Sequence, residues 1–179
     1  MQIFIATDGT LDTERTAEVV ARLYEEGDEV TIVTAIQFPR EFLRGVARAT
    51  GVDDVAEFAH EAGAGVLGIA GGAKAAERLS ALAKAGNVED HPLGDYFVQT
   101  AKDRTDGLRQ RLKDLGVSAV TAWASTENQT ARTILDIAKR CEADILLIGA
   151  KGRGRFEGPL GSTVTKVVRR ADVPVVVVK

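Results

Sequence analysis

The chain has 179 residues and a formal net charge of −3. This length suits one domain with a full core, and 45% hydrophobic with 27% charged residues excludes an intrinsically disordered chain. The acidic balance argues against a general nucleic-acid-binding protein, which needs an excess of cations to follow the phosphates. We therefore expect a single domain spanning residues 1–179, without a nucleic-acid partner.

Cysteine content and the first residues predict the compartment. Cys141 is the single cysteine, so no disulfide can form within the chain, and a reducing environment is expected. The apolar run at residues 3–6 is too short for a signal sequence or a membrane span, and no basic region precedes it. These features predict a cytoplasmic protein with no membrane partner.

The first part of the chain predicts a strand, a helix and a second strand. Residues 2–6 form an apolar, β-rich run that ends in a polar turn at residues 7–10. Thr10 or Asp12 can cap the following helix. A second apolar strand covers residues 29–36 and stops before Pro39. This order is a βαβ unit, which implies two parallel strands joined by a right-handed crossover.

Residues 40–95 are rich in glycine and alanine and predict a helical insertion after the second strand. Apolar spacing favours helices over about residues 53–62 and 73–85. The glycines would suit the hinges of a lid over a site. A packed helical elaboration or a dimer surface explains the same pattern, and both interpretations stay open.

From residue 95 the alternation of elements returns. An amphipathic helix ends at Gly116, and a strand follows over residues 117–124. Asn128 or Thr130 can cap the next helix, after which residues 145–148 form a short apolar strand. A last helix and a terminal strand at 175–178 complete the chain. This pattern predicts an α/β fold with a parallel, open sheet and helices on both faces.

Glycines and basic residues fill the loop between the last two strands. Its glycines are Gly149, Gly152, Gly154, Gly158 and Gly161, with Lys151, Arg153 and Arg155 between them. Glycine lets backbone N–H groups approach an anion closely, and the helix that starts after the loop directs its positive end there. The loop matches neither the Walker A motif nor GxGxxG. It therefore predicts a phosphate site in outline, against the alternative of a surface loop with solvated charges.

Asp8 follows the first strand directly. It could simply cap the first helix. In a parallel sheet, however, ligands bind beyond the carboxyl ends of the strands, so Asp8 and Gly149 are expected at the same edge.

Several of these motifs resemble the universal stress protein family, in its ATP-binding branch. The similar segments are Gly149-Ala150-Lys151-Gly152, Gly161-Ser162-Thr163, the terminal strand after Pro174, the turn Thr7-Asp8-Gly9-Thr10 and residues 127–138. The resemblance implies a Rossmann-like, five-stranded sheet of order 3-2-1-4-5. It also implies a regulatory stress-response protein that binds ATP, AMP or cyclic AMP, with Mg²⁺ accompanying ATP, and that forms a homodimer through residues 175–178.

The resemblance further implies the nucleotide site. Asp8 would contact the nucleoside, the backbone of Ala35 would meet the adenine edge, and the glycine loop would hold phosphates. The expected nucleotide-binding residues are Ala6, Thr7, Asp8, Ala35, Ile148, Gly149, Lys151, Gly152, Arg153, Gly161, Ser162 and Thr163. No catalytic residue and no metal ligand is expected among the side chains.

Two other functions remain open from the sequence. Eight residues, 153–160, separate Gly152 from Gly161, where the ATP-binding branch usually has nine. A dimeric scaffold without nucleotide is therefore one alternative. The other is a slow ATPase, although hydrolysis needs a base and metal ligands, and near the loop only Asp8 and Glu157 could serve.

Overall fold

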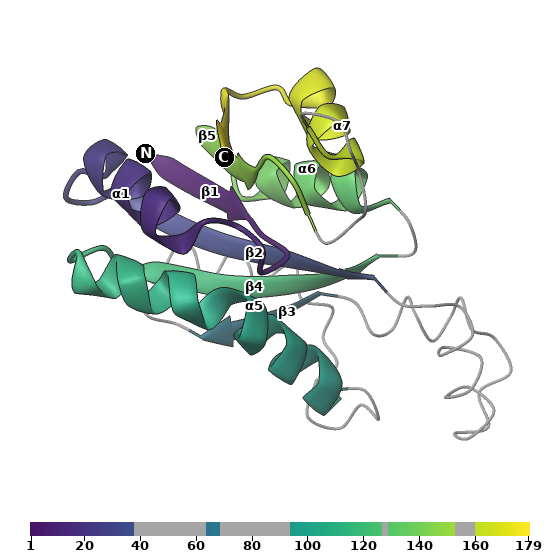
Figure 1. Ribbon diagram of the computed structural model, residues 1–179, viewed down its shortest axis with the longest axis horizontal. Helices are drawn as coiled ribbons and strands as arrows, with labels where there is room; N and C mark the ends of the chain where they lie inside the picture. The colour runs from purple at the N-terminus through teal and green to yellow at the C-terminus, as the bar shows by residue number, and fades with distance from the viewer. Residues whose placement is uncertain (38–63, 69–93, 127–128, 153–159) are drawn as a thin grey trace, which may run out of the picture.

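The computed structural model describes residues 1–37, 64–68, 94–126, 129–152 and 160–179. Strands and helices alternate along these residues, and Figure 1 labels them. In chain order they are β1 (Gln2–Ala6), α1 (Thr13–Leu23), β2 (Glu29–Gln37), β3 (Ala64–Gly68), α5 (Gly94–Asp114), β4 (Ala119–Thr126), α6 (Thr130–Arg140), β5 (Ile145–Gly149), α7 (Ser162–Arg170) and β6 (Val175–Val178).

The strands form a six-stranded sheet in the order β3-β4-β2-β1-β5-β6. All neighbours from β4 to β6 are parallel. Counted along the chain without β3, these five strands have the order 3-2-1-4-5. The predicted parallel sheet and its strand order are therefore confirmed.

Strand β3 was not predicted. It pairs antiparallel with β4 and forms one edge of the sheet. Its sequence, AGVLG, is short, contains two glycines and does not alternate, so no local signal separates it from the surrounding stretch. The insertion thus contributes a strand as well as connecting segments, and the helices expected over 53–62 and 73–85 lie outside the described residues.

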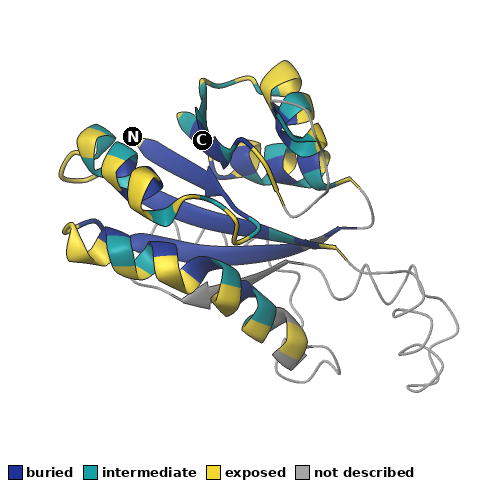
Figure 2. Cartoon of the chain, viewed as in Figure 1, coloured by how far each residue is buried: buried dark blue, intermediate teal, exposed yellow. Residues whose placement is uncertain are grey.

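Helices cover both faces of the sheet, as predicted. Helices α1 and α5 contact each other on one face, while α6 and α7 contact each other on the opposite face (Figure 1). Along β1, Ile3 and Ile5 pack in the core under α1 and α5, whereas Phe4 and Ala6 pack in the core under α6 and α7. All residues of β1 are buried, and Figure 2 shows the central strands buried along their length. This double burial explains why the strands appear as unbroken apolar runs.

The structure tests the residues that were predicted to cap α1 and α6. Asp12, not Thr10, caps α1, because its Oδ1 accepts the amide of Arg15 at 2.9 Å. Gln129 precedes α6 and makes no side-chain cap, whereas Thr130 is the first helical residue. The predicted cap by Thr130 is therefore wrong, and Asn128 lies outside the described residues. Among the helices that the structure describes, none has the length and apolar character needed to cross a bilayer.

Candidate functional site

A cavity of about 350 Å³ opens at the carboxyl ends of β1 and β5. These neighbouring strands mark the point where the strand order reverses, since the chain continues from β1 to β2 on one side and reaches β5 on the other. Open α/β sheets bind ligands at such switch points, and the volume is in the range of small-molecule sites. The described residues that line it are Ala6, Thr7, Asp8, Leu11, Ala35, Gln37, Arg104, Thr130, Ile134, Ile148, Gly149, Lys151, Gly152, Gly161, Ser162, Thr163 and Val164.

The turn after β1 fixes the carboxylate of Asp8. Oδ1 of Asp8 accepts hydrogen bonds from the amide of Thr10 at 3.1 Å and from its hydroxyl at 2.6 Å. Gly9 has a φ of +87°, a left-handed conformation that favours glycine, and its amide donates to Thr7 Oγ1 at 3.0 Å. Asp8 therefore belongs to a rigid turn and does not cap α1, a role that Asp12 fills.

The loop after β5 packs directly against this turn. A Cβ atom on Gly152 would lie 2.7 Å from Oδ2 of Asp8, far inside a normal contact distance. The hydroxyl of Thr10 also lies 3.2 Å from the carbonyl oxygen of Lys151. Two segments from opposite ends of the chain thus form one continuous wall, and the absence of a side chain at Gly152 permits it.

Two helix N-termini face the same cavity. Ser162, Thr163 and Val164 of the first turn of α7 line it, and so does Thr130 at the start of α6. Neither helix has an acidic residue in its first turn or a side-chain cap. The amide groups of both first turns and the positive ends of both helix dipoles are therefore available to an anion.

The opposite end of the cavity is built from β2 and α5. Strand β1 ends at Ala6, which pairs with Val33, but β2 continues to Gln37 beside β4. The carbonyl of Val33 accepts the amide of Thr7, so the polar backbone groups of Ala35, two residues further, point to the same side. Beyond the end of β1, that side is the cavity.

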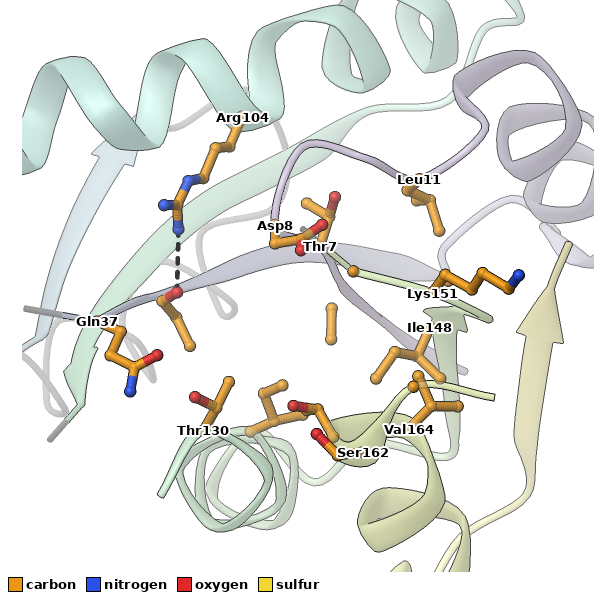
Figure 3. Close-up of a pocket in the computed structure, with 17 residues that line it drawn as sticks. Thr7, Asp8, Leu11, Gln37, Arg104, Thr130, Ile148, Lys151, Ser162 and Val164 are labelled. Carbon is orange, nitrogen blue, oxygen red and sulfur yellow. Dashed lines mark hydrogen bonds between the residues drawn. The ribbon is translucent and has the colours of Figure 1, made fainter. Parts of the chain in front are cut away.

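Arg104 of α5 reaches into this end of the cavity. Its Nη1 donates to the carbonyl oxygen of Ala35 at 3.1 Å and to Thr34 Oγ1 at 3.4 Å. Figure 3 shows the guanidinium descending from α5 toward β2, beside Gln37 and on the far side of Asp8 from Ser162 and Lys151. The guanidinium therefore lies at the β2 end, away from the first turn of α7, whereas Thr130 at the start of α6 lies on the same side of the cavity as Gln37 (Figure 3).

The structure brings nearly all the predicted site residues together. Every one of them except Arg153 lines the cavity, and Arg153, like Arg155, lies outside the described residues. Lys151 contributes the wall near Asp8, but its side chain is exposed and extends away from Asp8 (Figure 3). The residues named from the resemblance therefore lie around one cavity. The ammonium group of Lys151, however, does not point to the middle of that cavity.

Several lining residues were not expected. They are Leu11, Gln37, Arg104, Thr130, Ile134 and Val164. Arg104 had a sequence signal: it is three residues after Ala101 and four before Leu108, both buried, so a charged residue stands on the buried stripe of α5. Arg104 is half-buried there, and a charged residue on the core-facing side of a helix indicates a partner or a ligand.

The described part of the chain contains no group of three or more His, Cys, Asp or Glu side chains placed to hold a metal ion. Among the described lining residues, Asp8 supplies the one carboxylate, and the guanidinium of Arg104 and the two helix N-termini line the same cavity. Its described donors therefore suit an anionic organic molecule that also carries hydrogen-bonding groups.

Comparisons with solved structures agree with the fold. Hypothetical protein MJ0577 has a TM-score of 0.61 at 18% identity, with 99% of this chain and 94% of that chain covered. The universal stress protein of Archaeoglobus fulgidus in complex with dAMP has a TM-score of 0.53 at 18% identity, covering 100% and 98%. UspA from Lactobacillus plantarum also has 0.53 at 18%, covering 100% and 97%.

At the sequence level, a search of proteins with curated descriptions finds no significant match. The profile of the Universal stress protein family, in contrast, matches residues 1–179, the whole chain. The sheet order, the cavity at its switch point and this match lead to the same conclusion. The chain belongs to the universal stress protein family.

Proposed function

We propose that this protein is a regulatory nucleotide-binding protein whose ligand is an adenine nucleotide, ATP, AMP or cyclic AMP. The observation that carries the proposal is that two helix N-termini without side-chain caps and a glycine-lined loop all line one cavity, together with the carboxylate of Asp8. The similarly folded protein of Archaeoglobus fulgidus, which was crystallised with dAMP, supports an adenine nucleotide as the ligand class.

Each part of the nucleotide has chemically matched groups. Backbone amides of Gly149 and Gly152 and the first turn of α7 would hold phosphates, whereas the amide of Gly161 donates to the carbonyl of Ala150 at 2.8 Å and helps to shape the loop. Asp8 would accept hydrogen bonds from ribose hydroxyls, since a carboxylate repels phosphate but binds hydroxyl donors. The backbone of Ala35 would then meet the base at the other end. Magnesium would enter with ATP, whose phosphates supply the oxygen ligands that Mg²⁺ prefers.

Calorimetry with AMP and ATP tests the proposal through Gly161→Val. Gly161 has φ −62° and ψ 159°, an extended conformation open to any residue, and a Cβ there would meet its nearest atoms at 3.7–3.8 Å. The variant should therefore fold. Its side chain would stand 3.8 Å or less from the amide nitrogen of Gly152 and cover that donor, so binding should be lost.

Thermal unfolding of the same variant supplies the control. Without ligand, an unfolding temperature equal to that of the wild type shows that the variant folds. With a nucleotide at a hundred times its dissociation constant, the wild type should gain about 2.7 kcal/mol of stability, whereas a variant that has lost the site should gain none. Wild-type protein that binds none of the three nucleotides, with or without Mg²⁺, refutes the proposal. Affinity that survives Gly161→Val refutes the phosphate assignment.

We also propose that the protein forms a homodimer through residues 175–178. Strand β6 lies at an edge of the sheet, and its β5-facing backbone groups include the carbonyls of Pro174 and Val178, which accept the amides of Leu146 and Ala150. By alternation, the backbone groups of Val175 and Val177 point outward. An apolar edge of this kind is suited to pairing with a second copy.

A further inference from the structure

The contact between Arg104 and Ala35 bears on which base the cavity accepts. The first turn of α7 and the glycines of the loop after β5 lie at one end of the cavity, so we place the phosphates there and the base at the β2 end. At that end the backbone of Ala35 points into the cavity, and its carbonyl accepts a hydrogen bond from Nη1 of Arg104 at 3.1 Å. The base therefore meets a carbonyl that is already engaged by a cation.

The chemistry of the purine at position 6 decides what fits beside this pair. Adenine carries an amino group there, whose hydrogens need an acceptor such as the Ala35 carbonyl and are repelled by a guanidinium. Hypoxanthine and guanine carry an oxygen at the same position, which accepts hydrogen bonds. Arginine paired with this oxygen is a common way of reading guanine, and a hydrogen bond from an ionised donor is roughly twice as strong as a neutral one.

We propose that Arg104 is a specificity-determining residue that extends the ligands of this cavity from adenine nucleotides to 6-oxopurine nucleotides. This inference rests on the proposed nucleotide function. The planar guanidinium is half-buried, and its contacts with Ala35 and Thr34 hold it at the base end. A guanidinium carries five N–H donors, and we expect one of them to pair with an oxygen at position 6 when the nucleotide binds, whereas an adenine amino group would compete with Arg104 for the Ala35 carbonyl.

Calorimetry with AMP and IMP tests the proposal, because the two nucleotides differ only in that part of the base. Wild-type protein should bind IMP at least as tightly as AMP. Arg104→Met removes the charge and keeps an unbranched apolar stem, so it should shift the ratio of the two affinities toward AMP by about tenfold. Arg109→Met is the matched control on the same helix, because Arg109 pairs with Asp106 at the surface and does not line the cavity.

The outcomes separate this inference from the proposed function. Absence of binding for both nucleotides in wild-type protein refutes the nucleotide function itself. Binding of AMP without IMP, or the same affinity ratio in Arg104→Met and wild type, refutes the role of Arg104 while the nucleotide function stands. An equal loss for AMP, IMP and ribose 5-phosphate in Arg104→Met shows that Arg104 holds phosphate, which also overturns the inference. The wild-type comparison remains decisive if Arg104→Met does not fold.

Discussion

Gly152 and Asp8 touch across the cavity wall: a Cβ atom on the glycine would lie 2.7 Å from Oδ2 of the carboxylate. Contacts this short do not occur between real Cβ atoms and oxygen, so a side chain at position 152 would displace the carboxylate of Asp8 from its place. The glycine thus serves the approach of two loops, one after β1 and one after β5. Both residues also line the cavity.

Gly152→Ala should lower nucleotide affinity by about tenfold with little change in stability, because the added methyl group displaces the carboxylate of an exposed turn and not the core. Calorimetry with AMP and thermal unfolding would measure the two effects. A variant with wild-type affinity would show that the position of Asp8 does not matter for binding.

Asp8→Asn tests the charge of the same side chain. The amide oxygen of asparagine can still accept the amide of Thr10, so the turn should keep its shape. Hydrogen bonds from ribose hydroxyls to a charged acceptor would be lost, at a cost of about 1.5–3 kcal/mol, or roughly ten- to a hundred-fold in affinity. Pyrophosphate, which has no ribose, is the control, and it should bind the variant at least as tightly as the wild type because the carboxylate repels phosphate. An equal effect of Asp8→Asn on AMP and pyrophosphate would contradict a ribose contact.

Gly107→Ala should stabilise the protein. Gly107 is an exposed residue in the middle of α5, and a Cβ built there meets no atom within 4 Å. Alanine in a helix interior is favoured over glycine by about 0.5–1 kcal/mol. Urea unfolding would measure the gain, and nucleotide affinity should stay unchanged because the residue does not line the cavity. A less stable variant would show that α5 makes a contact at this position.

Sedimentation equilibrium at micromolar concentration should show a dimer. Val177→Pro should convert it to a folded monomer, since proline removes an N–H group that points away from β5 and is tolerated on an edge strand. Val176→Pro is the matched control, because the backbone of Val176 points toward β5 by the same alternation, and its loss should destabilise the fold. A wild-type monomer would refute the dimer through residues 175–178.

Most elements and the residues expected at the candidate site could be predicted from local patterns. Buried parallel strands are continuous apolar runs, and a strand-helix alternation restricts the topology, so the five parallel strands followed from pattern alone. Asp8 and the glycines at 149, 152 and 161 follow strands whose carboxyl ends share one edge, so they could be placed together before the fold was seen.

The lining residues that lie outside the motifs, such as Arg104, could not be placed from the sequence, because their position depends on how the elements pack. Helical periodicity shows that Arg104 lies on the core-facing side of α5. It does not show that Arg104 contacts Ala35 near the end of β2, because that contact depends on where α5 packs on the sheet. Strand β3 likewise could not be predicted from its five residues, two of which are glycines, because it is stabilised by pairing with β4, a segment distant in the sequence. Local signals describe the shape of each segment, whereas the contacts between distant segments depend on packing of the whole chain.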